Sequence, residues 1–432
     1  MVKLVQVRAS GGEVIGSFGV RLEQADLGLA HSLVPCAASE VRTRIKIGGV
    51  QCAMPYEASY LNISALAYGA LSDTAIEALS AGARLGGFLY NTGEAGIAPS
   101  FFKGGGDLCW QIGTAYFGCR TKQGRFDAAR FSETASSNQV RMIELKLSQG
   151  AKPALGGLLL ADKVTREVAE ICGIPANVDS YCPAAHAEFT TPLGLLTFLQ
   201  RLRELSGGKP VGFKLCVGRR RDILAICKAM LETDIVPDFI TVDDAAGGSG
   251  AAPIEFSTHV GLSLNHGLVA MHDALRGVGL RDRVRLIATG GVASGFDIVS
   301  RIALGADLCA AGRAFMLALG CVQALACESN VCPTGIATQD PRLSRGLVPR
   351  VKAERVAAYQ RATIQSFAEL VGTLGYDLPE RISPRDIVLQ HGSWRGQSLA
   401  DVVPLMPVGA LLEPHSAAAL DEAWSTASAR QF

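Results

Sequence analysis

The stretch "VRLIATGGVASGFDIVSRIALGADLCAAGRAF", residues 284–315, carries the pattern that decides the fold. An apolar run ends in Gly290 and Gly291, an amphipathic stretch follows, and a second apolar run ends in Gly312 and Arg313. Strand, helix and strand in that order predict a parallel βαβ unit.

Working outward, the same alternation of apolar runs and helical patterns extends back to about residue 61. Eight runs are strand candidates: 61–69, 86–93, 142–150, 176–181, 211–218, 239–248, 284–291 and 306–315. A (β/α)8 barrel closes with eight parallel strands separated by helices, so we expect an α/β protein of the TIM-barrel type.

The two ends of the chain differ from this central part. Residues 1–60 contain β-type runs between turn residues, which predicts a small β-rich extension. Residues 61–345 hold the expected barrel. Residues 346–432 begin with a long helical pattern, "AERVAAYQRATIQSFAELVGTLG", and predict a helical tail.

Composition excludes several classes of protein. Hydrophobic residues make up 48% and charged residues 19%, which indicates a globular chain rather than a disordered one. Lys and Arg total 41 against 40 Asp and Glu, so no overall field favours nucleic acid. The N-terminus lacks the apolar core of a secretory signal, and no apolar stretch is long enough to cross a membrane. We therefore expect a cytoplasmic protein.

The glycine-containing ends of the seventh and eighth predicted strands are candidates for a phosphate site. Glycines let backbone N–H groups approach a ligand, and the helix that begins near Ser294 has an N-terminus that favours an anion. The alternative is that these glycines only make tight turns. The pairing of two such loops at these strands favours phosphate binding.

Lys214 lies within the apolar run 211–218, where an unpaired ammonium costs several kcal/mol to bury. We expect it at the carboxyl end of its strand, facing an anion such as reduced flavin, although a lysine that merely reaches solvent from a strand end fits the run as well. Glu94, Gln149 and Gly248 fall in loops that follow other predicted strands, and Lys152 lies beside Gln149. All of these loops converge on one barrel mouth.

Three of the twelve cysteines, Cys321, Cys327 and Cys332, follow the spacing C-x5-C-x4-C just before Pro333. Thiolates presented from one short segment are typical of an iron–sulfur cluster, and three ligands suit a cubane that lacks one iron. Zinc is disfavoured because no histidine lies in the segment. On these residues alone buried thiols are the favoured interpretation, because the apolar helical pattern "ALGCVQALAC" could bury Cys321 and Cys327. The other nine cysteines are scattered as reduced buried thiols would be.

Residues 61–345 resemble the FMN-binding central domain of the glutamate synthases. The resemblance rests on motifs spread along this stretch: "LAYGALS", "RLGGFLYNTGEAG", "IELKLSQGAKP", "VGFKLCVG", "GGSGAAP", "GLRDRVRLIATGG" and "ALGCVQALACESNVCPTGIATQDP". The last motif contains the three clustered cysteines and is the most specific.

The resemblance implies an oxidoreductase with two cofactors. In the family the three cysteines hold a 3Fe-4S cluster, so Cys321, Cys327 and Cys332 become the expected ligands. FMN is expected at the barrel mouth on the following residues: Ala65, Leu66, Ala67, Gln149, Lys214, Gly248, Gly290, Gly291, Gly312 and Arg313. The family's reaction adds ammonia to 2-oxoglutarate and reduces the resulting 2-iminoglutarate with hydride from reduced flavin. Glu94 and Lys214 are the expected catalytic residues.

Departures from the family pattern shape the expected partners. Only about 60 residues precede the expected barrel, and they contain no N-terminal cysteine nucleophile for glutamine hydrolysis. Where the family reads "AKPGEGGQLPG" this chain reads "AKPALGGLLLA", with Leu155 in place of a glutamate. We expect separate amidotransferase-like and C-terminal-domain-like subunits. The resemblance also allows an N-methylglutamate synthase subunit that takes methylamine and glutamate, and a non-catalytic barrel that holds partner subunits is a further alternative.

Overall fold

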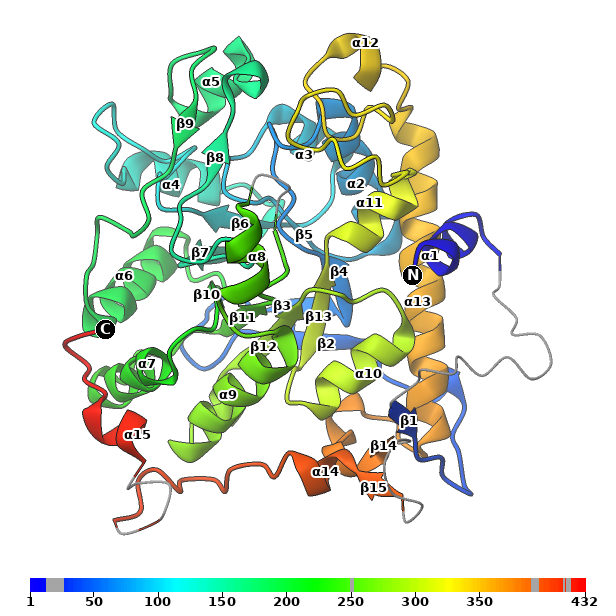
Figure 1. Cartoon of the computed structure of the whole chain (residues 1–432), viewed down its shortest axis with the longest axis vertical. Helices are drawn as coiled ribbons and strands as arrows, with labels where there is room; N and C mark the ends of the chain where they lie inside the picture. The colour runs from blue at the N-terminus through cyan, green and yellow to red at the C-terminus, as the bar shows by residue number, and fades with distance from the viewer. Residues whose placement is uncertain (13–26, 249–251, 390–395, 415, 417–420) are drawn as a thin grey trace.

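A computed structural model describes residues 1–12, 27–248, 252–389, 396–414, 416 and 421–432 (Figure 1). Eight parallel strands close a barrel, because the eighth strand pairs with the first through Cys309 and Leu61. In barrel order the strands are β4 (Leu61–Ile63), β5 (Tyr90–Asn91), β6 (Leu108–Ile112), β7 (Val140–Lys146), β10 (Val211–Cys216), β11 (Phe239–Asp243), β12 (Arg285–Thr289) and β13 (Leu308–Ala311). The expected (β/α)8 barrel is confirmed.

Helices surround the barrel on all sides (Figure 1). The helices of the barrel region are α2 (Asp73–Gly86), α3 (Pro99–Gly104), α4 (Ala128–Ala135), α6 (Pro192–Leu205), α7 (Arg220–Thr233), α8 (Ile254–His259), α9 (Leu264–Gly277), α10 (Gly295–Ala303) and α11 (Arg313–Leu319). Helix α2 shows why such segments form: Ser72 caps its first turn, and Gly87 in the left-handed region ends it.

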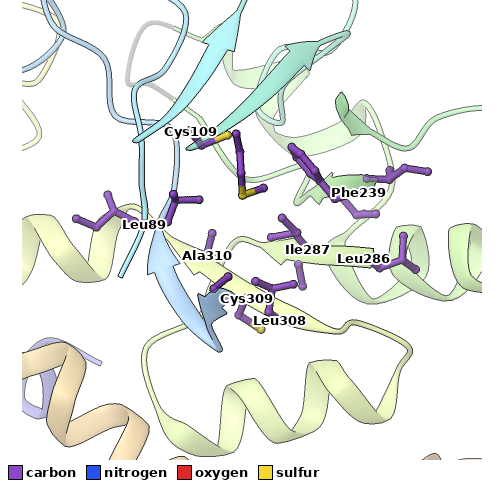
Figure 2. Packing of buried hydrophobic residues seen from close by; sticks show 14 of the residues in the cluster. Leu89, Cys109, Phe239, Leu286, Ile287, Leu308, Cys309 and Ala310 are labelled. Carbon is purple, nitrogen blue, oxygen red and sulfur yellow. The ribbon is translucent and has the colours of Figure 1, made fainter. Parts of the chain in front are cut away.

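The strands are buried on both faces, as parallel barrel strands must be. Every residue of β6, β10 and β11 is buried, and Trp110, Phe213 and Phe239 have no exposed surface. Figure 2 shows Cys109, Ile287 and Cys309 in this packed cluster. All twelve cysteines are free of disulfides, and Cys109 and Cys309 pack as small apolar side chains.

One of the expected barrel strands is wrong and one was missed. Residues 176–181 do not enter the barrel, because only Ser180–Tyr181 forms a strand, β9, which pairs antiparallel with β8 (Leu158–Leu159). The true third strand is β6, whose sequence "LCWQI" has only five residues. The run 142–150 therefore contains the fourth strand.

The chain ends also differ in part from the expectation. "KLVQVRA" lies within a helix, α1 (Val2–Ala9), because Val5 and Ala9 face the long helix α13 (Pro349–Thr373) at helical spacing. The β-type run that follows does form a hairpin, of β2 (Arg44–Ile47) and β3 (Tyr56–Ser59).

The tail after α13 is only partly helical. It contains the short helices α14 (Leu399–Val402) and α15 (Glu422–Thr426), and two strands, β14 (Ile387–Leu389) and β15 (Gln397–Ser398). These strands form a sheet with β1 (Leu27–Leu29). Within the described residues no helix is long and apolar enough to cross a membrane.

Two segments rise above the carboxyl ends of the barrel strands, in the upper part of the view in Figure 1. One follows β7 and contains β8, α5 (Arg166–Cys172) and β9. The other is the cysteine-containing segment between α11 and α12 (Pro341–Ser344). The barrel scaffold thus positions both over its mouth.

Candidate functional site

The loops that follow the barrel strands meet at one mouth, as the sequence predicts. The loop after β4, with Ala65, Leu66 and Ala67, lies between the loops after β13 and β5: an added Cβ at Gly312 would lie 3.5 Å from Leu66, and one at Gly93 would lie 2.7 Å from the Ala67 side chain. The hydroxyl of Tyr90 donates to the Leu66 carbonyl oxygen at 2.8 Å. This loop is therefore held from both sides.

Gln149 and Gly248 also reach the mouth. The loop after β7 packs tightly on the loop after β11, since an added Cβ at Gly248 would approach the Ala151 side chain to 2.8 Å. Residues 249–251 of the glycine-rich stretch 245–253 lie outside the described residues.

Glu94 is held in the mouth by Lys146. The Lys146 ammonium, at the end of β7, bonds the Glu94 carboxylate and donates to Gln149 Oε1 at 2.8 Å. Burial raises the pKa of Glu94, but Lys146, Lys214 and Lys152 outweigh that effect and hold it below its usual value. Glu94 is thus a carboxylate with one oxygen engaged by a lysine. Sequence reasoning missed Lys146, although its place in an apolar strand matches that of Lys214.

Lys214 lies at the mouth as expected, and its anionic partner comes from the chain itself. Its Nζ is 3.4 Å from Asp243 Oδ2, and both side chains are less than a tenth exposed. Burial alone would lower the pKa of Lys214, but the carboxylates of Asp243, Glu144 and Glu94 raise it above its usual value. The ammonium is therefore fixed in its charged form without any bound flavin.

Glu144 is a second residue that sequence reasoning did not single out. Its carboxylate accepts hydrogen bonds from the Asn91 and Gln111 amides at 2.8 and 2.5 Å and from the Thr241 hydroxyl at 2.6 Å. These donors come from β5, β6 and β11, so Glu144 links the strands inside the barrel. Both carboxylate oxygens of Glu144 accept hydrogen bonds from the protein itself, which indicates a structural role.

Lys152 differs from the other two lysines of the mouth. It is 3% exposed, yet its ammonium has no hydrogen-bond acceptor and no ion pair within the described residues. Burial, and then the like charge of Lys146, lower its pKa. An unpaired ammonium on a largely buried side chain attracts an anion, because a charge that has lost part of its water needs a partner. Lys152 is therefore a candidate to bind a carboxylate or phosphate near Glu94.

In the loops after β12 and β13, the backbone N–H groups are not all available to a phosphate. Ser294 does begin α10, but the Asp297 carboxylate already accepts the backbone N–H groups of Ala293 and Ser294, both at 2.9 Å. The two N–H groups that directly precede the helix are thus taken by the chain's own acid. Gly291, in contrast, has φ of 63° and open space beyond it. Gly291 therefore leaves more room for an anion than the two N–H groups that Asp297 occupies.

Strained backbone gathers in two loops of this region. Ala151 and Ala154, on either side of Lys152, have positive φ, and so do Gln323, Leu325 and Asn330 in the cysteine segment. Each residue in this region costs on the order of 1–3 kcal/mol and persists where the surrounding structure enforces it. Such strain is typical of functional loops.

The three clustered cysteines lie in one loop, as expected. Cys321 directly follows α11, Cys327 is exposed and Cys332 is buried. The Gln323 backbone N–H donates to Cys321 Sγ at 3.4 Å, and the Thr334 hydroxyl lies 3.3 Å from Cys332 Sγ. Among the described residues no three His, Cys, Asp or Glu side chains converge on a single ion.

Direct contacts join the cysteine segment to the loop after β4. The Ser72 hydroxyl donates to the Gly335 carbonyl oxygen at 2.6 Å, and the Ser72 backbone N–H donates to that of Ile336 at 2.8 Å. The Gln339 amide donates to the carbonyl oxygens of Gly69 and Leu71. The loop after β4 therefore touches the barrel mouth with one end and the cysteine segment with the other.

Comparison with known proteins places these features in one family. The family model described as "Conserved region in glutamate synthase" matches residues 24–377, beyond both ends of the stretch 61–345. The "Glutamate synthase large subunit-like protein YerD" of Bacillus subtilis (strain 168) is 36% identical over 79% of this chain and 65% of its own length. The "Archaeal-type glutamate synthase [NADPH]" of Thermotoga neapolitana is 31% identical over 74% of this chain and 60% of its own length.

This chain thus spans less than two thirds of these relatives. In the "Glutamate synthase [NADPH] large chain" of Azospirillum brasilense the matching region, 32% identical, is 18% of the protein. The match runs through the barrel, the loops of its mouth and the cysteine segment. The chain belongs to the glutamate synthase family.

Proposed function

We propose that this chain is an FMN- and iron–sulfur-dependent oxidoreductase of the glutamate synthase type. Its substrate would be 2-oxoglutarate with an amine, which condense to a 2-iminoglutarate-like compound and water before reduction. The observation that carries the proposal is the unpaired ammonium of Lys152 near a fixed carboxylate and two paired lysines, at the mouth of a barrel where Gly291 has open space beside it.

The side chains of the mouth suit a dicarboxylic 2-oxo acid. Lys152 would bind one substrate carboxylate, because its charge has no other partner within the described residues. Glu94 keeps one oxygen on Lys146 and is ionised, so its other oxygen can accept a proton from the attacking amine. Lys146 then lies beside the site as a proton donor for the imine nitrogen.

The mouth also fits FMN. Bound at the mouth in its reduced form, FMN would supply the hydride for the imine carbon. Gly291 and Gly312 leave room for a phosphate, and Arg313 is exposed at the start of α11. Leu66 and Ala67 would flank the ring, and Lys214, held in its charged form by Asp243, would lie near its anionic edge. Ala65, Gln149, Gly248 and Gly290 line the same mouth.

The cysteine segment fits a 3Fe-4S cluster in its donor chemistry. A three-iron cluster takes each thiolate on a different iron, so its ligands stand farther apart than those of a single ion. Cys321, Cys327 and Cys332 are close enough that the first and last raise the pKa of Cys327, although burial raises it most. The N–H and hydroxyl groups beside Cys321 and Cys332 are donors of the kind that stabilise cluster sulfurs.

We further propose that electrons enter at the cysteine segment from a separate partner. Val322, Leu325 and Val331 in this segment are 62, 83 and 62% exposed. Exposed apolar side chains of this size around a redox centre suit a protein surface rather than water. Amidotransferase-like and C-terminal-domain-like subunits are the partners that the family resemblance suggests.

A second candidate is the N-methylglutamate synthase reaction, in which methylamine and glutamate give N-methylglutamate and ammonia. The loop that covers Glu94 favours it. An added Cβ at Gly157 would lie 2.7 Å from Glu94 Oε1, and this loop continues into Leu158 and Leu159, with Leu155 exposed just before it. An apolar cover over the amine position suits a methylated amine.

The decisive experiment is a substrate assay on protein reconstituted with FMN and iron. Ammonia, methylamine and glutamine are each supplied with 2-oxoglutarate or glutamate, with a chemical reductant and with candidate partner subunits. The proposal expects amino acid formation with ammonia, and the second candidate expects N-methylglutamate with methylamine. A reconstituted protein that binds FMN but turns over none of these pairs contradicts both.

A further inference from the structure

Lys163 joins three segments above the barrel mouth. It belongs to the segment after β7 and is 4% exposed. Its Nζ donates to the carbonyl oxygen of Cys327 at 2.5 Å, to that of Ala70 at 3.2 Å and to that of Ala337 at 3.3 Å. Ala70 lies in the loop after β4, whereas Cys327 and Ala337 lie in the cysteine segment.

The number of these bonds favours the charged form of Lys163, although burial lowers its pKa. An ammonium has three N–H donors and all three are used, whereas a neutral amine has only two. No carboxylate lies within ion-pair distance of Lys163 among the described residues. A buried cation whose direct contacts are all neutral carbonyls is costly unless negative charge lies nearby. Glu328 and the thiols of Cys327 and Cys332 lie near enough to favour the charged form of Lys163, and a cluster on those thiolates would add to this negative charge.

Lys209 shows what a purely structural lysine looks like in this fold. It is 7% exposed and its ammonium also bonds two carbonyl oxygens, those of Ala135 and Ser137. Ala135 ends α4 and Ser137 follows it, while Lys209 itself directly precedes the amino end of β10, away from the mouth. The negative end of the α4 helix dipole stabilises the Lys209 cation, which explains its burial without a counterion. The ammonium of Lys163 instead bonds the backbone carbonyl oxygen of Cys327, an expected cluster ligand.

We propose that Lys163 is a positioning residue that holds the cysteine segment on the loop after β4 and that its fixed positive charge raises the reduction potential of the cluster. The proposal rests on the iron–sulfur assignment of the proposed function. One electron from the donor makes the cluster and its three thiolates one unit more negative, with no bond formed or broken. A neighbouring cation therefore stabilises the reduced form more than the oxidised form.

The test is a redox titration of Lys163→Met in the reconstituted full chain. Dithionite with mediators supplies the electrons, and the EPR signal of the oxidised cluster reports its fraction. Loss of the charge should favour the oxidised form by about tenfold or more, which lowers the one-electron potential by about 59 mV or more. The flavin, followed by absorbance in the same titration, should move less.

Three further variants make the result specific. Lys163→Arg keeps the charge and should restore the wild-type potential. Lys163→Gln keeps a donor but not the charge and should behave as Lys163→Met, and it takes the place of that variant if Lys163→Met loses its cluster. Lys209→Met removes a comparable buried charge away from the cluster and should leave the potential unchanged.

The outcomes separate this inference from the function it rests on. A wild-type chain that assembles no iron–sulfur cluster overturns the cluster assignment itself. A wild-type chain with a cluster overturns the role of Lys163 alone if Lys163→Met and Lys163→Gln change the redox ratio by less than about twofold, or about 18 mV. A drop of equal size in Lys163→Arg would also refute the electrostatic role.

Discussion

Replacing Lys152 with methionine tests how the mouth holds its substrate. The Lys152 residue is 3% exposed and its ammonium has no partner within the described residues, so a substrate carboxylate gains a charge-assisted hydrogen bond. A charge-assisted hydrogen bond contributes about 1.5–3 kcal/mol, which raises KM for 2-oxoglutarate about 10- to 140-fold in Lys152→Met. The effect on kcat should be smaller, because the bond forms in the ground state as well as in the transition state.

Steady-state kinetics with 2-oxoglutarate as the varied substrate measures this change. Lys152→Arg should recover most of the affinity, and Lys209→Met should leave KM unchanged because that lysine bonds carbonyls away from the mouth. A KM in Lys152→Met within twofold of the wild-type value would refute the assignment of Lys152 to the substrate carboxylate.

The pH dependence gives a second measurement on the same residue. Burial and Lys146 lower the pKa of Lys152 from 10.5, so the free protein loses this charge at a lower pH than an ordinary lysine. Affinity for 2-oxoglutarate should therefore fall as pH rises through that lowered pKa. At pH values between the lowered pKa and 10.5, Lys152 is protonated in the unfolded chain but not in the folded one. In that range Lys152 therefore makes the free energy of unfolding rise with pH. Lys152→Met should remove both dependences.

Other variants test separate parts of the structure. Lys214→Met should lower kcat at least about tenfold, or about 1.4 kcal/mol in barrier, whereas a non-catalytic barrel would keep the activity of its complex. Gly291→Val should weaken FMN binding, measured by flavin fluorescence, because φ of 63° strains a β-branched residue and its side chain enters the open space; unchanged affinity would place the phosphate elsewhere. Arg203→Met leaves the buried Asp238 with two backbone N–H donors but no counterion, and should lower the free energy of unfolding in urea by about 3–5 kcal/mol. KM for 2-oxoglutarate should not change in that variant.

The barrel was predictable because its strands are apolar and glycine ends several of them. The two errors have one cause. "LCWQI" (108–112) is short and buried on both faces, so it has no alternation to reveal it. Residues 176–181 contain β-type residues but are mostly exposed, and they belong to the segment above the mouth rather than to the barrel. Local pattern cannot tell which of two short runs pairs with distant strands.

The candidate site was predictable in its positions but not in its pairings. Strand-end logic placed Glu94 and Lys214 at the mouth. It did not show that Asp243 neutralises Lys214, because the two carboxyl-end residues meet only across neighbouring strands. It also did not show that the Asp297 carboxylate accepts a backbone N–H group at the start of α10 that a phosphate would otherwise use. These features depend on register and on loop geometry, which spacing along one chain does not contain.

The central claim is that one barrel mouth holds FMN while the segment touching its first loop holds an iron–sulfur cluster. Metal and flavin analysis of the reconstituted wild-type chain, with EPR on the oxidised sample, tests it most directly. We predict about three irons per FMN and the signal of an oxidised three-iron cluster, which Cys327→Ser abolishes while FMN stays bound. A chain that binds FMN but shows no cluster signal, or one whose signal survives Cys327→Ser, would contradict the claim.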